Sequence, residues 1–459
     1  MAYYAELFEP LRQEISKGEV LLPDSPCYEE SLRRWSATCD KRACVIVKPT
    51  DAREVSAAVR FATSANLPIA VCCGGHSTGG GSSSEGGLVI DLSLMRSIDV
   101  HPAAQTAVIG GGCLTKHVDE AVSKHGLAAV SGTEHTVGYG GFVLGGGYSF
   151  LTPLHGLGCD NLLEVEVVLA DGSIVKASNK ENSDLFWALR GAGPQFGVCT
   201  KFTTRLHKQG DAWVGVMVFS PDKLADIVAF ANHLHEHHDG RQYMGFGCTT
   251  MAPAYEPALV CAVFFNGGQE DAEAYFKPLL DAGPRLNTAK IRPWHEVNGT
   301  MTSLSVAARK TQGTANFIMP LDSKNLQEAS DMFFAFVREK DIQNGPVIMW
   351  EVVPYDKIRE LDNTATAFAA RNEMYQIATV FQWDDQALDT EVRDFNAKLT
   401  KFLKSTGIRA GVQGYNNYDG LALTPEEAYG ENLERLRELK KKYDPTNVFS
   451  KWHPILASS

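Results

Sequence analysis

The chain has 459 residues, with 43 Lys and Arg against 55 Asp and Glu, so its formal net charge is −12. Hydrophobic residues make up 44% and charged residues 21%, which excludes a disordered or fibrous chain and predicts two or three globular domains. The surplus of acid, with no dense Lys and Arg cluster, argues against nucleic acid or an anionic membrane surface as a partner.

The cysteines and the N-terminus predict where the protein resides. Ten cysteines stand at irregular spacings without a C-x-x-C motif, which favours reduced thiols over a disulfide framework. Acids at positions 6 and 9 precede any basic residue and no apolar run follows, so no signal peptide is predicted. The uncharged stretch from His135 to Cys159 contains eight glycines in 25 residues, which excludes a membrane helix. We expect a soluble, cytoplasmic protein.

The first 206 residues predict a mixture of strands and helices. Strands are expected at 43–49, 69–73, 88–92, 106–111, 165–177 and 196–206. A helix begins after Thr50 or Asp51, with Glu54 in the capping-box position. The segment 165–177 is expected to be a hairpin turning at Asp171-Gly172, and a short helix at 183–189 follows it.

The pattern changes near residue 210, where glycine becomes sparse. Helices are predicted at 221–238 and 325–338, and apolar strands at 259–265 and 347–353. The last fifty residues return to glycine, tyrosine and a charged helix at 431–442, whose acids precede its lysines as the helix dipole favours. We therefore predict one domain at 1–209, a second at 210–408, and a C-terminal segment at 409–459 that returns to the first domain.

Glycine is concentrated in one part of the chain. Of 41 glycines, 20 lie between Gly74 and Gly158, in the clusters 74–87, 110–112 and 138–147. Strand-like runs flank each cluster, which favours main chain pressed against a ligand over flexible loops. The amides of the first loop are able to form a nest for a pyrophosphate, and the loop 133–147 could line a flat polar ring system. We expect no hydrophobic neighbour to bury His76, which is either part of that site or an ordinary hydrogen-bonding residue.

Other familiar signatures are absent or weak. The chain has no Walker A loop and no G-x-G-x-x-G motif. Residues 75–79 match the G-x-S-x-G of a hydrolase elbow, but the TGGGSSS that follows Ser77 is a poor helix former. His233 and His237 could share a helix face and hold a metal, yet no cysteine or carboxylate completes a ligand set, so no metal is expected.

Seven motifs in order carry a family resemblance. They are GGHS (74–77), EHTVG with GGFVLGGGY (134–148), GLGCDNL (156–162), WALRGAGPQFGV (187–198), TAFAARNEMY (366–375), YNNY (415–418) and YDPTNVF (443–449). In this respect the chain resembles the vanillyl-alcohol-oxidase/p-cresol-methylhydroxylase type of FAD flavoprotein, in its berberine-bridge-enzyme-like branch. The resemblance implies an α+β fold with a Gly-rich FAD-binding domain and a substrate domain whose antiparallel sheet is covered by helices.

The resemblance also implies a cofactor site for FAD, with His76 bonded to the 8α methyl group of the flavin. It implies FAD contacts, mostly from main chain, for Gly74, Gly75, Ser77, Thr78, Thr133, Glu134, Thr136, Val137, Gly141, Gly145 and Val198, with Asn417 near the ring. Many relatives carry Cys-Pro where this chain has Glu134-His135, so the second flavin bond made by that cysteine is impossible here. The tail, with Trp452-His453 where relatives usually have asparagines, is a further departure.

The chemistry implied is transfer of a hydride from a C–H bond to FAD, while a base takes the proton from an adjacent O–H. We predict an oxidase of a hydroxylated small molecule that reduces O2 to hydrogen peroxide. A dehydrogenase with another electron acceptor and a flavin-binding protein without turnover are the alternatives. In relatives, a small β-branched residue at the position of Val137 accompanies oxidase activity.

Two residues are candidates for the base. Tyr415 and Tyr418 lie three residues apart on a segment predicted to be a strand, so we expect them on opposite faces. The resemblance indicates that Tyr418 faces substrate. Glu351, on a strand predicted to face inward, is a weaker candidate for base or for substrate anchor. A carboxylate close to Tyr418 is expected to raise the pKa of the tyrosine. The alternative is that Tyr418 is a core aromatic and Glu351 an ordinary ion-pair residue.

Overall fold

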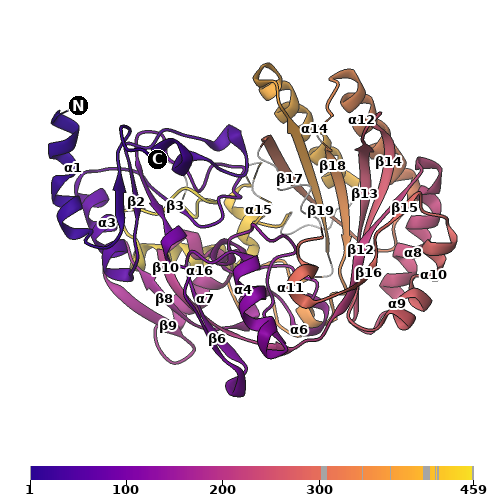
Figure 1. Ribbon diagram of the computed structural model, residues 1–459, viewed down its shortest axis with the longest axis horizontal. Coiled ribbons are helices and arrows are strands. Elements are labelled where there is room, and N and C mark those ends of the chain that lie inside the picture. Colours follow the sequence, from indigo (N-terminus) through magenta and orange to yellow (C-terminus); the bar gives the residue numbers. More distant parts are fainter. Residues whose placement is uncertain are drawn as a thin grey trace.

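The computed structural model describes residues 2–300, 308–343, 345–372, 374–406, 414–418, 420 and 423–456. Two halves are visible in Figure 1: a mixed half built mainly from the first 208 residues and the C-terminal segment, and a half built around one large sheet. This is the α+β architecture that the sequence predicted, with a Gly-rich half and a half whose antiparallel sheet carries helices.

The first sheet contains the only parallel strand pairs among the described residues. Its strands are β1 (Glu19–Leu21), β2 (Val45–Lys48), β3 (Ile69–Cys72) and β4 (Leu88–Asp91), in the order β1-β2-β4-β3. Helix α3 (Ala52–Ser64) connects β2 to β3, and Asp51 caps it by accepting hydrogen bonds from the amides of Arg53 (2.9 Å) and Glu54 (3.1 Å). Glu54 in turn accepts from the Thr50 amide at 2.8 Å, so the predicted helix start is confirmed.

The second sheet is antiparallel and lies beside the first. Its strands are β5 (Ile98–His101), β6 (Thr106–Gly110), β8 (Leu162–Val168), β9 (Ile174–Ser178) and β10 (Val198–Arg205), in the order β5-β6-β10-β8-β9. The pairing of Val168 with Ile174 confirms the hairpin at Asp171-Gly172, where Gly172 has a φ of +82°. A small separate ladder joins β7 (Leu127–Ala128) to β11 (His207–Lys208).

The helices of this half come from both ends of the chain. They are α1 (Ala2–Glu14), α2 (Tyr28–Leu32), α4 (Thr115–Val122), α5 (Tyr139–Leu144), α6 (Thr152–His155), α7 (Ser183–Ala192), α15 (Pro425–Tyr429) and α16 (Leu433–Tyr443). Leu436 of α16 and Ile455 of the tail are fully buried in the same core as the second sheet and α7. The C-terminal segment therefore packs against the N-terminal half, which is also where its yellow ribbon lies in Figure 1.

The third sheet has eight antiparallel strands and forms the other half. They are β12 (Ala212–Phe219), β13 (Gln242–Met251), β14 (Glu256–Phe265), β15 (Leu286–Asn287), β16 (Lys290–Arg292), β17 (Arg309–Phe317), β18 (Val347–Val352) and β19 (Tyr375–Trp383). Their order is β15-β12-β14-β13-β18-β19-β17, with β16 also paired to β12.

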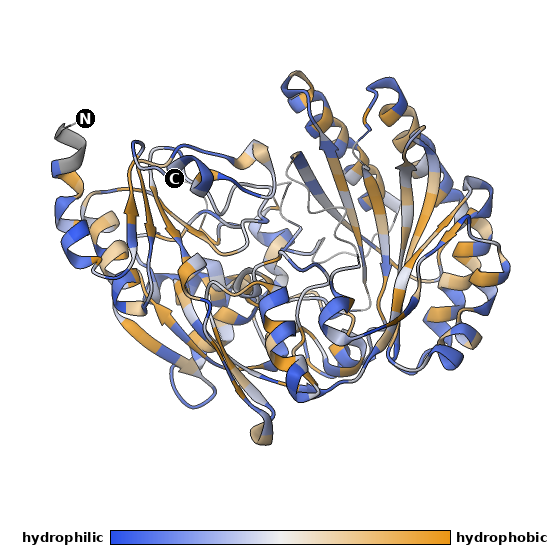
Figure 2. Cartoon of the chain, in the orientation of Figure 1, coloured by the Kyte–Doolittle hydropathy of each residue, from blue (hydrophilic) through white to orange (hydrophobic). Residues whose placement is uncertain are grey.

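Helices cover the outer face of this sheet. Along the chain the helices of this half are α8 (Leu224–Glu236), α9 (Gln269–Tyr275), α10 (Lys277–Asp281), α11 (Trp294–Val297), α12 (Ser323–Glu339), α13 (Asp356–Arg359) and α14 (Asp389–Thr406). Apolar side chains of α8, α12 and α14 share one core with the strands, and Figure 2 shows their polar faces turned outward. The opposite face of the sheet looks toward the Gly-rich half.

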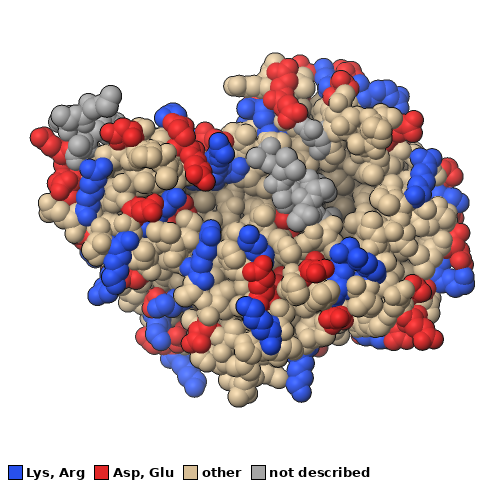
Figure 3. Space-filling model, viewed as in Figure 1, with Lys and Arg blue, Asp and Glu red and all other residues tan. Residues whose placement is uncertain are grey.

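Apart from the strand predicted around Tyr415 and Tyr418, the strands and helices predicted from the sequence are present, with shifts at their ends. The helix expected at 221–238, for example, is a 3-10 turn followed by α8. The domain limit near 209 stays a prediction, and the limit at 408–409 lies outside the described residues. In the part of the chain that the structure describes, no helix combines the length and the apolar composition needed to cross a bilayer. On the face shown in Figure 3, acidic and basic side chains are interspersed.

Candidate active site

A large cavity lies between the two halves of the molecule and has two different walls. One wall, here called the glycine wall, consists of the loops 73–82 and 132–138 with the start of α5, to which Gly141 belongs. The other, the sheet wall, consists of Val347, Met349 and Glu351 on β18 with Ala378 and Val380 on β19. These side chains share one face because strand residues alternate, and the ladder pairs Val347 with Val380 and Met349 with Ala378.

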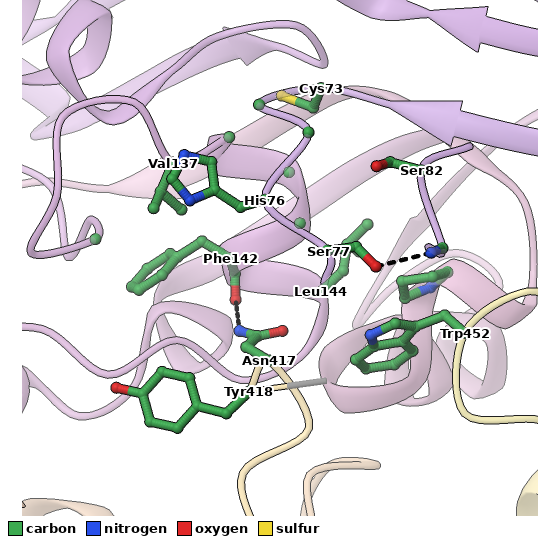
Figure 4. A pocket seen from close by; sticks show the side chains of 18 of the residues that line it. Cys73, His76, Ser77, Ser82, Val137, Phe142, Leu144, Asn417, Tyr418 and Trp452 are labelled. Atoms are coloured by element: carbon green, nitrogen blue, oxygen red, sulfur yellow. Dashed lines mark hydrogen bonds between the residues drawn. The ribbon is translucent and has the colours of Figure 1, made fainter. Parts of the chain in front are cut away.

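The glycine wall depends on one close backbone approach and on one glycine in the left-handed conformation. A Cβ on Gly74 would lie 2.4 Å from the amide nitrogen of Gly138, so the two loops pack main chain against main chain. Gly75 has a φ of +70°, a conformation that glycine adopts without strain. The chain therefore turns just before His76, and the His76 side chain reaches the cavity (Figure 4).

His76 is held by partners from distant parts of the chain. The ring of Trp35 stacks on it, with 5.0 Å between centroids and 16° between planes. Its Nε2 lies 2.8 Å from Oγ1 of Thr136, and Thr136 donates a hydrogen bond through this hydroxyl to Oε2 of Glu134. The expectation that His76 lacks a hydrophobic neighbour is wrong, because the tertiary structure brings in Trp35, which lies 41 positions earlier.

Burial keeps the imidazole of His76 neutral. Burial lowers the pKa of His76 to about 4, with Glu134 opposing that shift and Lys310 reinforcing it. Lys310 is fully buried on β17, and its Nζ lies 3.9 Å from the centre of the Trp35 ring. Burial lowers the pKa of Lys310 to about 8, against the attraction of Glu134.

Most of the predicted cofactor residues meet at this cavity. Those that line it are Gly74, Gly75, His76, Ser77, Thr133, Glu134, Val137, Gly141 and Asn417. The other four lie just behind. Thr136 forms a hydrogen bond with His76. Gly145 contacts Asn417, since a Cβ added to Gly145 would lie 2.0 Å from Oδ1 of Asn417. The Thr78 carbonyl accepts from the Cys39 thiol at 3.2 Å, and the Val198 side chain is buried in the core while its neighbours Gly197 and Cys199 line the cavity.

These residues fit a long cofactor with a polar chain and a flat ring. A Cβ on Gly141 would meet nothing within 4 Å, so the backbone there leaves open space in the cavity wall. The hydroxyl of Ser82, also on the wall, is buried and has no hydrogen-bond partner among the described residues. Ser77 binds the Gly81 amide at 2.7 Å and holds this loop closed (Figure 4). Trp452 of the tail lines the same region.

At the sheet wall, a carboxylate accepts hydrogen bonds from two phenols. Glu351 accepts from Tyr418 at 2.8 Å through one oxygen and from Tyr243 at 2.9 Å through the other. Burial raises the pKa of Glu351, and these two hydrogen bonds oppose the shift. Burial, and then the charge of Glu351, raises the pKa of Tyr418 well above its usual range. Tyr418 is therefore a neutral donor to Glu351, and all three residues line the cavity.

The local structure around Tyr418 differs from the prediction. Residues 415–418 form a turn closed by a hydrogen bond from the Tyr418 amide to the Tyr415 carbonyl at 2.8 Å, and no strand is present there. The two tyrosine rings contact each other edge to face, with centroids 5.0 Å apart. The prediction of opposite faces is wrong, because Asn416 and Asn417 favour a turn. Tyr415 instead accepts hydrogen bonds from the amides of Gly147 and Tyr148.

Three residues had no motif to reveal them in the sequence: Trp35 and Tyr243 line the cavity, and Lys310 lies over the Trp35 ring. Trp35 lies in a loop, and Tyr243 looks like any aromatic residue in a strand. Lys310 carries the only usable signal, since a lysine inside a strand whose neighbours are buried needs a partner. Its place beside Trp35 and Glu134 depends on the pairing of β17 in the third sheet.

The two alternative motifs have structural explanations. No helix follows Ser77: residues 77–87 form turns and bends, so Ser77 is not on a hydrolase elbow. His233 and His237 stack on each other, with centroids 4.5 Å apart, near the end of α8. Within the described ranges, no three His, Cys, Asp or Glu residues are grouped as metal ligands.

Comparison with known proteins also indicates an FAD-binding protein. A family model described as "FAD binding domain" matches residues 43–178, and one described as "Berberine and berberine like" matches 414–455. FAD-linked oxidoreductase pgmH of Aspergillus terreus is 33% identical, covering 99% of this chain and 97% of that protein. The crystal structure of 6-hydroxy-D-nicotine oxidase from Arthrobacter nicotinovorans superposes with a TM-score of 0.83 at 27% identity, covering 96% of this chain and 98% of that one. Glucooligosaccharide oxidase from Acremonium strictum shares the fold, with a TM-score of 0.84 at 24% identity over 98% of this chain and all of that one.

The glycine wall and the matching cofactor-domain model define an FAD-dependent oxidoreductase. With a relative 33% identical over nearly the full length of both chains, the protein belongs to the vanillyl-alcohol-oxidase/p-cresol-methylhydroxylase family of FAD flavoproteins, in its berberine-bridge-enzyme-like branch. FAD is its cofactor.

Proposed function

We propose that this protein is an oxidase that removes a hydride from a hydroxylated small molecule and reduces O2 to hydrogen peroxide, with FAD bonded covalently through His76. The observation that carries the proposal is the position of the Glu351–Tyr418 pair on the same cavity as the His76 loop. A proton acceptor thus faces the residues that fit the cofactor. The FAD, when bound, supplies the hydride acceptor.

The protein's contribution is to take the substrate's hydroxyl proton. Tyr418 alone is a poor base, because burial and Glu351 raise its pKa. Its hydroxyl already donates to Glu351 at 2.8 Å, however, so the oxygen has a lone pair free to accept from a substrate O–H. As the substrate proton moves to the Tyr418 oxygen, the Tyr418 proton moves to Glu351. Tyr243 holds the other Glu351 oxygen at 2.9 Å and fixes the carboxylate in place.

The sheet wall also favours one kind of substrate. Val347, Met349, Ala378 and Val380 form a continuous apolar surface beside Glu351. A sugar chain would lose the hydration of its hydroxyls against such a surface, whereas a flat apolar body with one hydroxyl group would not. We therefore place the substrate among hydroxylated aromatic or similarly apolar metabolites.

The experiment is anaerobic mixing of the holoenzyme with a panel that contains 4-hydroxybenzyl alcohol, 6-hydroxynicotine and cellobiose. Loss of the absorbance of oxidised flavin reports hydride transfer, and peroxide release after air is admitted reports the oxidase step. We expect an apolar member of the panel to bleach the flavin and air to restore it with one peroxide per flavin. Reduction without reoxidation by air would indicate a dehydrogenase, and bleaching by cellobiose alone would overturn the substrate class.

A further inference from the structure

Hydrogen bonds connect His76 to Thr136 and Thr136 to Glu134, so a proton on His76 could pass along this chain to the carboxylate. Both the amide (2.9 Å) and the hydroxyl of Thr136 donate to Oε2 of Glu134. A threonine hydroxyl has one proton, and here that proton is directed at the carboxylate. Its oxygen must therefore accept from His76, 2.8 Å away, so the His76 proton is on Nε2 and the lone pair is on Nδ1.

The ring that carries this lone pair is fixed in position. Trp35 stacks on one face of the imidazole at 5.0 Å, and Lys310 lies over the Trp35 ring at 3.9 Å. These residues come from a loop near the N-terminus and from β17 of the third sheet. Because the imidazole is neutral, its Nδ1 is a competent nucleophile at neutral pH.

We propose that Glu134, acting through Thr136, is the base that allows His76 to bond to FAD; this rests on the covalent linkage proposed above. The new bond joins Nδ1 to the 8α carbon, and one C–H bond of that methyl group breaks. The imidazole, bonded at Nδ1, gives its Nε2 proton to the Thr136 oxygen while the Thr136 proton moves to Glu134. The flavin takes two electrons, and O2 removes them. The hydrogens lost, one from the methyl carbon and one from Nε2, leave in one hydrogen peroxide.

The family resemblance implies that many relatives have, at the position of Glu134, the cysteine of a second flavin bond. This chain has a carboxylate there instead, and it lies 3.8 Å from Nε2 of His76, the residue of the proposed linkage. The chain thus has, at one position, a residue that supports the remaining bond. Glu134 and Thr136 are positioning residues in this scheme, since both act through His76.

The test is the rate at which added FAD becomes bonded to protein produced under riboflavin limitation. Intact mass gives the covalent adduct, and flavin retained on gel filtration gives total binding. We expect Glu134→Gln and Thr136→Val to bind FAD but to form the adduct about 10²-fold more slowly or less completely than wild type. Thr136→Ser, which keeps the hydroxyl, should form the adduct at nearly the wild-type rate, and Glu120→Gln, an exposed carboxylate on α4, should have no effect.

Each other outcome has a definite meaning. Adduct formation at the wild-type rate in Glu134→Gln or in Thr136→Val overturns the proposed proton path. Equal loss of total and covalent flavin in Thr136→Val and Thr136→Ser shows a structural role and also overturns it. If wild type forms no adduct, the linkage and this proposal both fall, while peroxide release by enzyme with dissociable FAD would leave the oxidase proposal standing.

Discussion

The two walls of the cavity are built by opposite means. The glycine wall is rich in glycine, and its loops approach each other so closely that a Cβ on Gly74 would lie 2.4 Å from Gly138. The sheet wall is made of side chains from two paired strands. Main-chain groups are the same in every sequence, so a cofactor held by them is retained as side chains change. A substrate that contacts side chains is selected by a few substitutions.

Because the two walls differ in this way, we expect substitutions on one wall to change flavin binding or reoxidation, and substitutions on the other to change substrate oxidation. On the glycine wall they should change how FAD is held or how it meets O2. On the sheet wall they should change which molecule is oxidised, and how fast, without changing flavin content. The following predictions run from the largest expected effect to the smallest.

Tyr418→Phe should have the largest effect. It keeps the ring and removes the hydroxyl that links the substrate proton to Glu351. We expect flavin reduction by substrate to slow by roughly 10²–10⁴-fold, with flavin content unchanged. Anaerobic stopped flow measures the rate. The matched variant Tyr243→Phe removes the other hydrogen bond to Glu351 and should cost much less, because Tyr243 only orients the carboxylate. Equal effects in the two variants would remove Tyr418 from the proton path, and Glu351→Gln would then be the variant to examine.

Met349→Ala tests the sheet wall as a substrate surface. Truncation removes apolar contact beside Ala378 and leaves the hydrogen bond between Glu351 and Tyr418 in place. We expect KM for an apolar substrate to rise about tenfold, which corresponds to roughly 1.4 kcal/mol of binding energy. Flavin content should not change. Gly141→Ala, on the glycine wall, should lower flavin content and leave KM unchanged, since its Cβ projects into open space in the cofactor region. Loss of flavin in Met349→Ala would contradict the division between the walls.

Val137→Leu tests the glycine wall as a control of oxygen access. Val137 lines the cavity beside His76 (Figure 4). The larger side chain should crowd the approach of O2, so reoxidation of the reduced flavin should slow several-fold. Reduction by substrate should stay near the wild-type rate, because the sheet wall is untouched. Mixing reduced enzyme with aerated buffer measures the first rate, and a Val137→Ala variant controls for altered packing. Reoxidation at the same rate in all three proteins would exclude Val137 as the control of oxygen access.

The smallest effect on turnover is expected where the two halves meet, because the prediction there concerns stability. Asp119 of α4 is fully buried and accepts hydrogen bonds from Ser131 (2.9 Å) and from Asn298 (2.8 Å), which follows α11. Burial raises the pKa of Asp119 from 3.8 to about 7, so folding favours its protonated form. Its contribution to the free energy of unfolding is therefore fully present below pH 3.8 and is lost as the pH rises through 7.

Asp119→Asn cannot titrate at this position and serves as the reference. The wild-type Tm minus the variant Tm should be a few degrees larger at pH 5 than at pH 8, following a slope of about 1.4 kcal/mol per pH unit below pH 7. Differential scanning fluorimetry of both proteins across this range measures the difference. A constant difference would show that Asp119 keeps its ordinary pKa in the folded protein.

Local patterns in the sequence determined the regular elements and the glycine wall. Apolar periodicity and the Asp51 and Glu54 cap specify β2 and α3, because these signals act within one turn of helix or a few strand residues. Clustered glycines indicated a site for main-chain contact, because only residues without a Cβ allow loops to lie as close as Gly74 and Gly138. The GGHS and YNNY motifs named His76 and Tyr418 as residues to examine.

Only the tertiary structure decided what surrounds those residues. Trp35 and Lys310 are 275 positions apart in the sequence and come together beside His76 because β17 joins the third sheet through β19. Tyr243 and Tyr418 converge on Glu351 because β13 pairs with β18 while a turn in the C-terminal segment places Tyr418 at the cavity. Such contacts depend on strand pairing and on packing between distant segments, which no local pattern encodes. The sequence by itself therefore specified a flavin site, whereas the environment that sets the protonation of His76 and Tyr418 was decided by the fold.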